Sequence, residues 1–316
     1  MILAYYTKIN KLEFQKYLNN YSIGNVLFFK GIEEGIENTN YFFETKKKEK
    51  YILTIYENKI TERIKKKNLS FFIELINFLK RKNFPCPQIL YNNKRKQLSS
   101  YKNKKYAIIN FIEGNIAKKV NNKHCYNLGK SLAIFHKTTL YFNKKRKNDF
   151  SLNEWNKIIK KNKLPKKDSL FLKKELRYLK KNWPKRLPSG IIHGDLFPDN
   201  VFFKKNNIVG IIDLSNACND FFCYDLSICI NAWCYKEKLD LQKMKSLIRG
   251  YNSIRKINTQ EIKYLNFFLR ASSLRFYLSR LMDSQNKKIP KKYNKNPNEY
   301  LNKLKYFQSN NLKKKF

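Results

Sequence analysis

The 316-residue chain is poor in glycine, arginine and acidic side chains. It holds nine glycines and 24 acidic residues, and only 11 of its 67 basic residues are arginine. No apolar run approaches the roughly 18 to 20 residues of a membrane span, and the first residues lack the pattern of a signal peptide. The six cysteines include no CxxC pair, so we expect buried free thiols in a reducing compartment. We therefore expect a soluble, cytoplasmic protein with no membrane partner.

The formal net charge of +43 raises the question of a polyanionic partner. Proteins that read nucleic acids favour Arg, whose planar fork suits phosphates and guanine edges, whereas the basic residues here are mostly Lys. Lys, Asn, Ile, Tyr and Phe are abundant together, which is typical of AT-rich codon usage. We attribute the charge to lysines on solvated surfaces and predict no nucleic-acid partner.

A hydrophobic content of 42% allows a sizeable core, and its pattern changes along the chain. The first third reads as strands at 26–31, 40–45, 51–57, 88–92 and 105–114, with helices at 12–21 and 69–82. From Asn121 onward the apolar spacing is mostly helical. We predict an α+β, bilobal fold. Its small β-rich N-lobe would span residues 1–112 and its larger helical C-lobe residues 113–316.

The segment IIHGDLFPDNVFF (191–203) carries the clearest chemical signal. Acidic residues are scarce in this chain, yet five of the 24 fall between His193 and Asp225. The HGDxxxxN loop between apolar strands, followed by Asp213, would bring Asp195, Asn200 and Asp213 to one site. Phosphoryl transfer needs a carboxylate to orient the acceptor hydroxyl, and an amide and a second carboxylate to hold Mg²⁺.

A second segment, GIEEGIENTNY (31–41), has the character of a phosphate loop between two strands. Gly31 and Gly35 would let the backbone approach the phosphates, and backbone N–H groups would form the anion cradle. We count Asn38 with them as a nucleotide-binding residue.

These motifs resemble the aminoglycoside-phosphotransferase and choline-kinase branch of the protein-kinase-like fold. Similarity to the kinase-like homoserine kinases of threonine biosynthesis extends over the sequence segments GIEEGIENTNYFF, HGDLFPDNVFF, INAWCY, LRFYLSRL and NPNEYLNKLKYF. The resemblance covers nearly the whole chain and implies ATP-dependent phosphorylation of L-homoserine to O-phospho-L-homoserine, with Mg²⁺. By position it makes Asp195 the catalytic residue, Asn200 and Asp213 the metal ligands, and Asp225 the structural Asp that braces the loop.

The chain departs from the usual kinase pattern in its third strand, where Thr54 stands in place of the Lys that touches the phosphates. Lys59 or Arg63 would supply the charge, or Mg²⁺ and the loop amides would suffice. Glu74 occupies the position of the usual helical partner of that Lys.

The acceptor pocket is harder to read from the sequence. A carboxylate is well recognised by Arg, so Arg275 and Arg280 are our candidates for the homoserine carboxylate, and Asp199 is a candidate for its ammonium. His193 would hold the loop by hydrogen bonds, since Asp195 is better placed as the base. We read His136 as an ordinary helix residue.

Two other functions stay open at this point. The acceptor could be another small alcohol, such as choline or an aminoglycoside, although aminoglycoside pockets are normally rich in acidic residues and the C-terminal third is not. A basic nucleic-acid-binding protein or inactive scaffold would leave Asp195, Asn200 and Asp213 unexplained. The sequence leaves the oligomeric state open.

Overall fold

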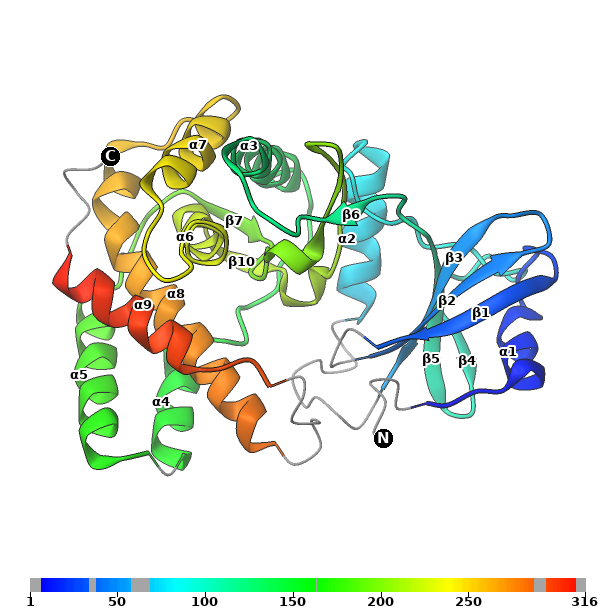
Figure 1. Ribbon diagram of the computed structural model, residues 1–316, viewed down its shortest axis with the longest axis horizontal. Coiled ribbons are helices and arrows are strands. Elements are labelled where there is room, and N and C mark those ends of the chain that lie inside the picture. Colours follow the sequence, from blue (N-terminus) through cyan, green and yellow to red (C-terminus); the bar gives the residue numbers. More distant parts are fainter. Residues whose placement is uncertain (1–6, 34–37, 58–68, 163, 287–293, 311–316) are drawn as a thin grey trace. The chain divides into compact units, whose positions relative to one another are not determined.

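The computed structural model describes residues 7–33, 38–57, 69–162, 164–286 and 294–310 (Figure 1). The chain divides into two compact units, and the division falls between Glu113 and Gly114. The sequence places the lobe boundary one residue earlier, after residue 112.

The first unit is built on a five-stranded antiparallel sheet with the order β1-β2-β3-β5-β4. Along β2 (Asn38–Thr45) buried and less buried residues alternate, because successive side chains point to opposite faces of a sheet. The strands are β1 (Val26–Ile32), β2 (Asn38–Thr45), β3 (Lys50–Tyr56), β4 (Ser99–Tyr101) and β5 (Lys104–Asn110).

One helix covers each face of this sheet. Helix α1 (Lys11–Leu18) packs Phe14 and Tyr17 into a cluster with strand residues that include Tyr106. The next residue along β5, Ala107, points to the other face and packs in a cluster with Ile73 of helix α2 (Leu69–Arg81). The aromatic and β-branched strands predicted from the sequence therefore form a sheet that is covered on both faces.

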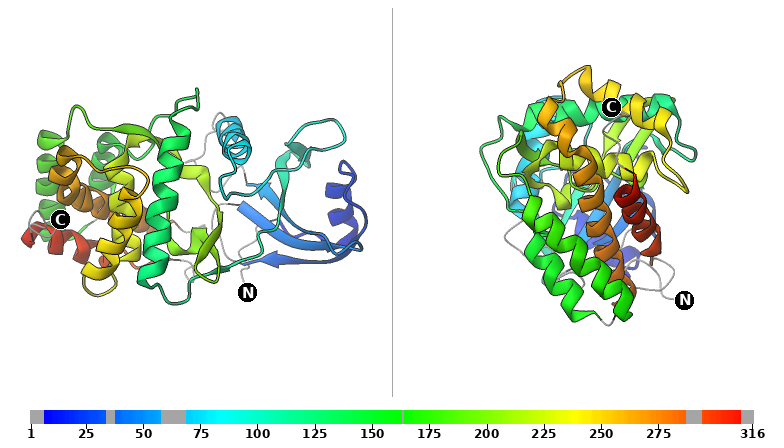
Figure 2. Two further views of the ribbon diagram at one scale, coloured as in Figure 1. Left: turned by 90° about the horizontal axis from the view of Figure 1, so that it is seen from above. Right: turned by 90° about the vertical axis from the view of Figure 1, so that its left-hand side faces the viewer.

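The second unit is mainly helical. Its helices are α3 (Asn122–Thr139), α4 (Leu152–Lys161), α5 (Lys166–Asn182), α6 (Phe222–Trp233), α7 (Leu241–Asn252), α8 (Thr259–Gln285) and α9 (Asn298–Ser309). Figure 2 shows α4, α5 and α8 side by side. None of the described helices is long and apolar enough to cross a membrane.

Two small antiparallel sheets lie among these helices and carry the loop of interest. Strand β7 (Ser189–Ile192) pairs with β10 (Cys218–Phe221), and β8 (Val201–Lys204) pairs with β6 (Asn115–Ile116) and β9 (Asn207–Ile211). Two short 3-10 helices, η2 (Pro198–Asn200) and η3 (Leu214–Asn216), continue the loops.

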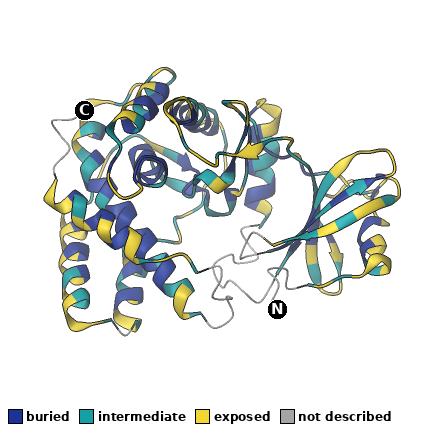
Figure 3. Cartoon of the chain, viewed as in Figure 1, coloured by how far each residue is buried: buried dark blue, intermediate teal, exposed yellow. Residues whose placement is uncertain are grey.

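Helix α6 forms the centre of the second unit, and Figure 3 shows it buried on all sides. Its residues are buried around the whole helix and include the polar Asp225, Ser227 and Asn231, so the sequence gives no amphipathic period, and the sequence analysis missed this helix. Helix α4 was missed as well. The strand predicted at 88–92 is wrong, because this segment contributes only an isolated bridge between Ile89 and Ile109.

The cysteines agree with their sequence prediction. All six are free and buried. Burial raises the pKa of the Cys86 thiol to about 11 and that of Cys218 to about 12.

Candidate active site

The HGD motif forms the loop that leaves β7, and a glycine conformation shapes it. Gly194 has a φ of +75°, and a Cβ built on it would lie 3.0 Å from the carbonyl oxygen of Asn216. A side chain at this position would be strained in its backbone and crowded by η3. The only glycine in the motif is therefore required by the geometry of the loop.

Asp225 of α6 holds this loop from beneath. The backbone N–H of His193 donates to Asp225 Oδ2 at 2.8 Å, and the N–H of Gly194 donates to Oδ1 at 2.9 Å. Burial alone would raise the pKa of this fully buried carboxyl, but hydrogen bonds and the neighbouring histidines lower it overall. The contacts match the bracing role that the sequence resemblance implies for Asp225.

A chain of buried hydrogen bonds continues from Asp225 to the start of α8. His136 Nε2 donates to Asp225 Oδ2 at 3.0 Å, and His136 Nδ1 lies 2.7 Å from the Tyr251 hydroxyl. Arg255 Nη1 donates to the same hydroxyl at 3.2 Å, and Arg255 Nη2 donates to Glu261 Oε2 at 3.0 Å. We call these five residues the bracing chain.

The direction of each bond in the bracing chain follows from donor chemistry. Arg can only donate, so the Tyr251 oxygen accepts from Arg255 and its O–H donates to His136 Nδ1. The proton of a neutral His136 is then on Nε2, where it donates to Asp225. Burial lowers the pKa of His136 and favours this neutral form. The sequence analysis read His136 as an ordinary helix residue and missed this role; the scarcity of His, three in the chain, was the available signal.

His193 fixes the shape of the loop, as the sequence analysis predicts. Its Nε2 donates to the carbonyl of Ile212 at 3.0 Å, and the backbone N–H of Asp195 donates to its Nδ1 at 3.3 Å. Burial lowers the pKa of His193 despite the nearby carboxylates. A neutral imidazole with both nitrogens engaged is suited to holding the loop.

Asp195 stands at the centre of the loop and is half-buried. Its Oδ2 accepts from Asn216 Nδ2 at 3.3 Å. Burial, together with the nearby Asp213 carboxylate, raises the pKa of this carboxyl to about 7, although Arg275 opposes the rise. A carboxyl with a pKa near neutrality is well tuned for accepting a proton at physiological pH.

Asn200 and Asp213 flank Asp195, as the spacing of the motif predicts. Asn200 Nδ2 donates to the carbonyl of Asp195 at 2.8 Å, which directs the amide nitrogen into the loop. Asp213 has a left-handed backbone with φ 60°, and its carboxylate accepts from the N–H and hydroxyl of Ser215. Among the described residues no three His, Cys, Asp or Glu side chains gather as a metal site.

The donor set nevertheless fits a hard divalent cation. Asp195 and Asp213 are close enough for one to raise the pKa of the other, and a cation would relieve that repulsion. Carboxylate and amide oxygens are the ligands that Mg²⁺ prefers. Asn200 and Asp213 are thus residues that could hold Mg²⁺.

The two arginines predicted to bind a carboxylate both have protein partners. Arg275 is 3% exposed and its Nη1 donates to the carbonyl of Gly194 at 2.5 Å. Arg280 is 9% exposed, and its Nη1 donates to Glu299 at 2.6 Å and to the carbonyl of Asn296 at 2.9 Å. Their assignment to the substrate stays a prediction, since each guanidinium already supports a neighbouring segment.

The predicted nucleotide-binding residues lie in the first unit. Gly31 is in β1 opposite Tyr41, and Asn38 begins β2 opposite Tyr56. Gly35, Lys59 and Arg63 lie outside the described residues. Thr54 donates its hydroxyl to Asn40 Oδ1 at 2.8 Å, so a neutral hydrogen bond occupies the position of the usual strand Lys.

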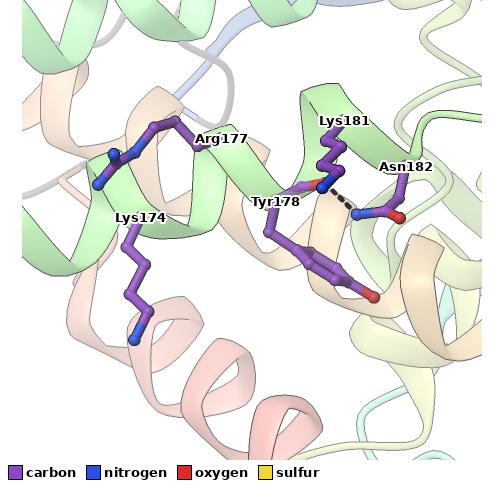
Figure 4. Close-up of a pocket in the computed structure, with 5 residues that line it drawn as sticks. All are labelled: Lys174, Arg177, Tyr178, Lys181 and Asn182. Carbon is purple, nitrogen blue, oxygen red and sulfur yellow. Dashed lines mark hydrogen bonds between the residues drawn. The ribbon is translucent and has the colours of Figure 1, made fainter.

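One surface hollow of the second unit lies apart from these residues. Figure 4 shows that its labelled residues come from a single helix, α5: Lys174, Arg177, Tyr178, Lys181 and Asn182. None of them belongs to the HGD loop or to the bracing chain, so the hollow is not part of the candidate active site.

Comparison with known sequences identifies the family. Residues 29–256 match the model of the phosphotransferase enzyme family. The chain is 39% identical to the homoserine kinase of Bartonella tribocorum over 98% of both chains. It is 38% identical to the homoserine kinase of Agrobacterium fabrum, over 97% of this chain and 96% of that protein.

Solved structures agree on the fold. An amicoumacin kinase in complex with AMP-PNP and Ca²⁺ has a TM-score of 0.75 at 16% identity, with 96% of this chain and 92% of that chain covered. An aminopropanol kinase has a TM-score of 0.68 at 13% identity, with 95% and 94% covered. The predicted α+β, protein-kinase-like fold is confirmed. This chain belongs to the phosphotransferase enzyme family and, within it, to the homoserine kinases.

Proposed function

We propose that this protein transfers the γ-phosphoryl group of ATP to the hydroxyl of L-homoserine and releases ADP and O-phospho-L-homoserine. The observation that carries the proposal is 39% identity to a homoserine kinase over nearly the full length of both chains, in a chain that has Asp195, Asn200 and Asp213 in one loop region. Six free, buried cysteines support a location in the reducing cytoplasm.

In the proposed mechanism Asp195 orients the substrate hydroxyl and accepts its proton as the oxygen attacks phosphorus. The fixed loop supplies the positioning, since His193, Asp225 and Arg275 each hold a backbone group within two residues of Asp195. Asn200 and Asp213 would hold Mg²⁺, which neutralises charge on the phosphates. Gly31, Gly35 and Asn38 are proposed to contact the nucleotide.

A coupled assay of ADP release tests the proposal against its alternatives. We expect turnover with L-homoserine and much slower turnover with choline, L-serine or an aminoglycoside. Faster phosphorylation of choline or an aminoglycoside would show that homoserine is not the preferred acceptor, while the assignment as a kinase would stand.

Metal removal tests the proposed ligands separately. Exhaustive EDTA treatment should abolish activity, and Mg²⁺ or Mn²⁺ should restore it, whereas Zn²⁺ should not. Asp213→Ala should raise the Mg²⁺ concentration needed for half-maximal activity, and excess Mg²⁺ should rescue it only in part. Full activity after EDTA treatment would contradict a role for Asn200 and Asp213 in binding metal.

A further inference from the structure

An ion pair joins the catalytic loop to the segment before α9, and its exposed side chains contribute little to the stability of the fold. Lys295 Nζ lies 2.9 Å from Asp199 Oδ2, and the two side chains are 53% and 55% exposed. Asp199 is in η2, directly before Asn200, whereas Lys295 precedes α9 and lies 96 residues further along the chain. Among the described residues it is the one ion pair made by the HGD loop.

The pair lies within electrostatic reach of the catalytic carboxyl. Asp199 raises the pKa of the Asp195 carboxyl and Lys295 lowers it. The Lys295 ammonium is also 5.6 Å from the ring centroid of Phe197 in the same loop. A positive and a negative side chain therefore stand together beside the group that is proposed to receive the acceptor hydroxyl.

The segment that carries Lys295 is held in place by buried contacts. Arg280 donates to the carbonyl of Asn296, the next residue, and pairs with Glu299 of α9. Glu299 also pairs with Lys303, which is 1% exposed and donates to the carbonyl of Asn231. Arg280 thus acts on Lys295 through the backbone and is a positioning residue in this account.

The chemistry of the acceptor matches this arrangement. Homoserine carries an ammonium and a carboxylate on one carbon and a hydroxyl two carbons further along. The next step rests on the proposed function. We infer that the ion pair between Asp199 and Lys295 opens when L-homoserine binds. Asp199 then pairs with the α-ammonium and Lys295 with the α-carboxylate, and the hydroxyl is directed toward Asp195. The pair is then a recognition site for a zwitterion, and Lys295 disfavours acceptors that are only cationic.

Accessibility favours Lys295 over the two arginines as the group that meets the carboxylate. Arg275 and Arg280 are buried and donate to protein oxygens, whereas half of the Lys295 side chain is open to solvent. An ion pair between exposed side chains contributes little to stability, so opening it for a substrate that replaces both partners costs little.

Substitution of each partner tests the inference by its substrate dependence. Lys295→Met should raise the KM for L-homoserine by about tenfold or more, the effect of losing one charge-assisted hydrogen bond. The ATP KM and kcat should change little, and Lys295→Arg should restore most of the affinity. Lys157→Met is a matched control, because Lys157 forms an exposed ion pair with Glu154 elsewhere in the same unit.

Ligands that lack one charge separate the two contacts. Binding of 3-amino-1-propanol, which has no carboxylate, is measured as a substrate or as a competitive inhibitor; Lys295→Met should leave it unchanged or tighten it, and Asp199→Asn should weaken it. The inference would be overturned if Lys295→Met weakened the binding of homoserine and of 3-amino-1-propanol equally. It would also be overturned if the KM of Lys295→Met for homoserine equalled that of Lys157→Met. A parent enzyme that does not phosphorylate homoserine would instead overturn the proposed function.

Discussion

Tyr251→Phe removes one hydroxyl from the bracing chain and leaves the ring in place. That hydroxyl takes part in a buried hydrogen bond of 2.7 Å to His136 and a partly buried one of 3.2 Å from Arg255. Its removal leaves His136 Nδ1 without its donor in a fully buried site. Loss of one partner of a buried polar group costs about 1 to 3 kcal/mol. For a unit of this size that loss lowers the melting temperature by roughly 3 to 10 °C.

The variant should also lose activity, because His136 supports Asp225 and Asp225 supports the backbone of the catalytic loop. We expect kcat to fall by roughly tenfold, the scale of a small misplacement of catalytic groups, while the KM for ATP stays close to that of the parent. Thermal unfolding followed by circular dichroism and steady-state ADP release measure the two effects. Tyr277→Phe is the control, since Tyr277 is 3% exposed in the same unit and no described residue accepts from its hydroxyl.

A Tyr251→Phe enzyme with the melting temperature and kcat of Tyr277→Phe would refute this reasoning. The chain from Glu261 to Asp225 would then be a packing arrangement without energetic coupling to the loop. A loss of stability with unchanged kcat would separate the two claims and leave only the structural one.

Four further predictions concern the loop itself. Asp195→Asn should lower kcat by roughly 10² or more in the ADP-release assay. In urea titrations without metal, Asp195→Asn should be more stable than the parent between pH 5 and pH 8, by up to about 4 kcal/mol. The Asp195 carboxyl has a pKa of about 7 in the folded protein against an ordinary value of 3.8, so the parent loses stability as pH rises from about 4 to about 7. The kcat/KM of the parent should rise with pH and level off above about 7, because only the ionised carboxylate accepts a proton; a profile flat from pH 5 to 9 would contradict this. Gly194→Ala should destabilise the protein by about 1 to 2 kcal/mol and lower kcat, and an equal melting temperature would show that the loop adapts.

The sequence predicted those elements whose structure is set by residues close together in the chain. Aromatic and β-branched segments separated by polar ones placed β2 and β3, and an amphipathic period ending in basic residues placed α2 within a residue of its end. The HGD spacing placed Asp195, Asn200 and Asp213 together because only a short loop and one strand pair separate them.

Contacts between residues far apart in the sequence could not be predicted from such local patterns. Arg275 and Arg280 were assigned to a ligand on chemical grounds, and nothing in the sequence shows that their guanidiniums also contact Gly194 and Glu299. Likewise, His136 and Asp225 are 89 residues apart, so their contact is set by how α3 packs against α6. Lys295 is one of many lysines, and only its tertiary position distinguishes it.

The burial of every thiol makes this protein a convenient subject for labelling. Cys86 lies in the first unit, and the other five cysteines lie in the second. A thiol reagent should react with the folded chain only after local or global opening, because every thiol is shielded from solvent and burial raises the pKa of the Cys86 and Cys223 thiols. Mass spectrometry of the labelled peptides would therefore report the opening of each unit separately, without any introduced probe.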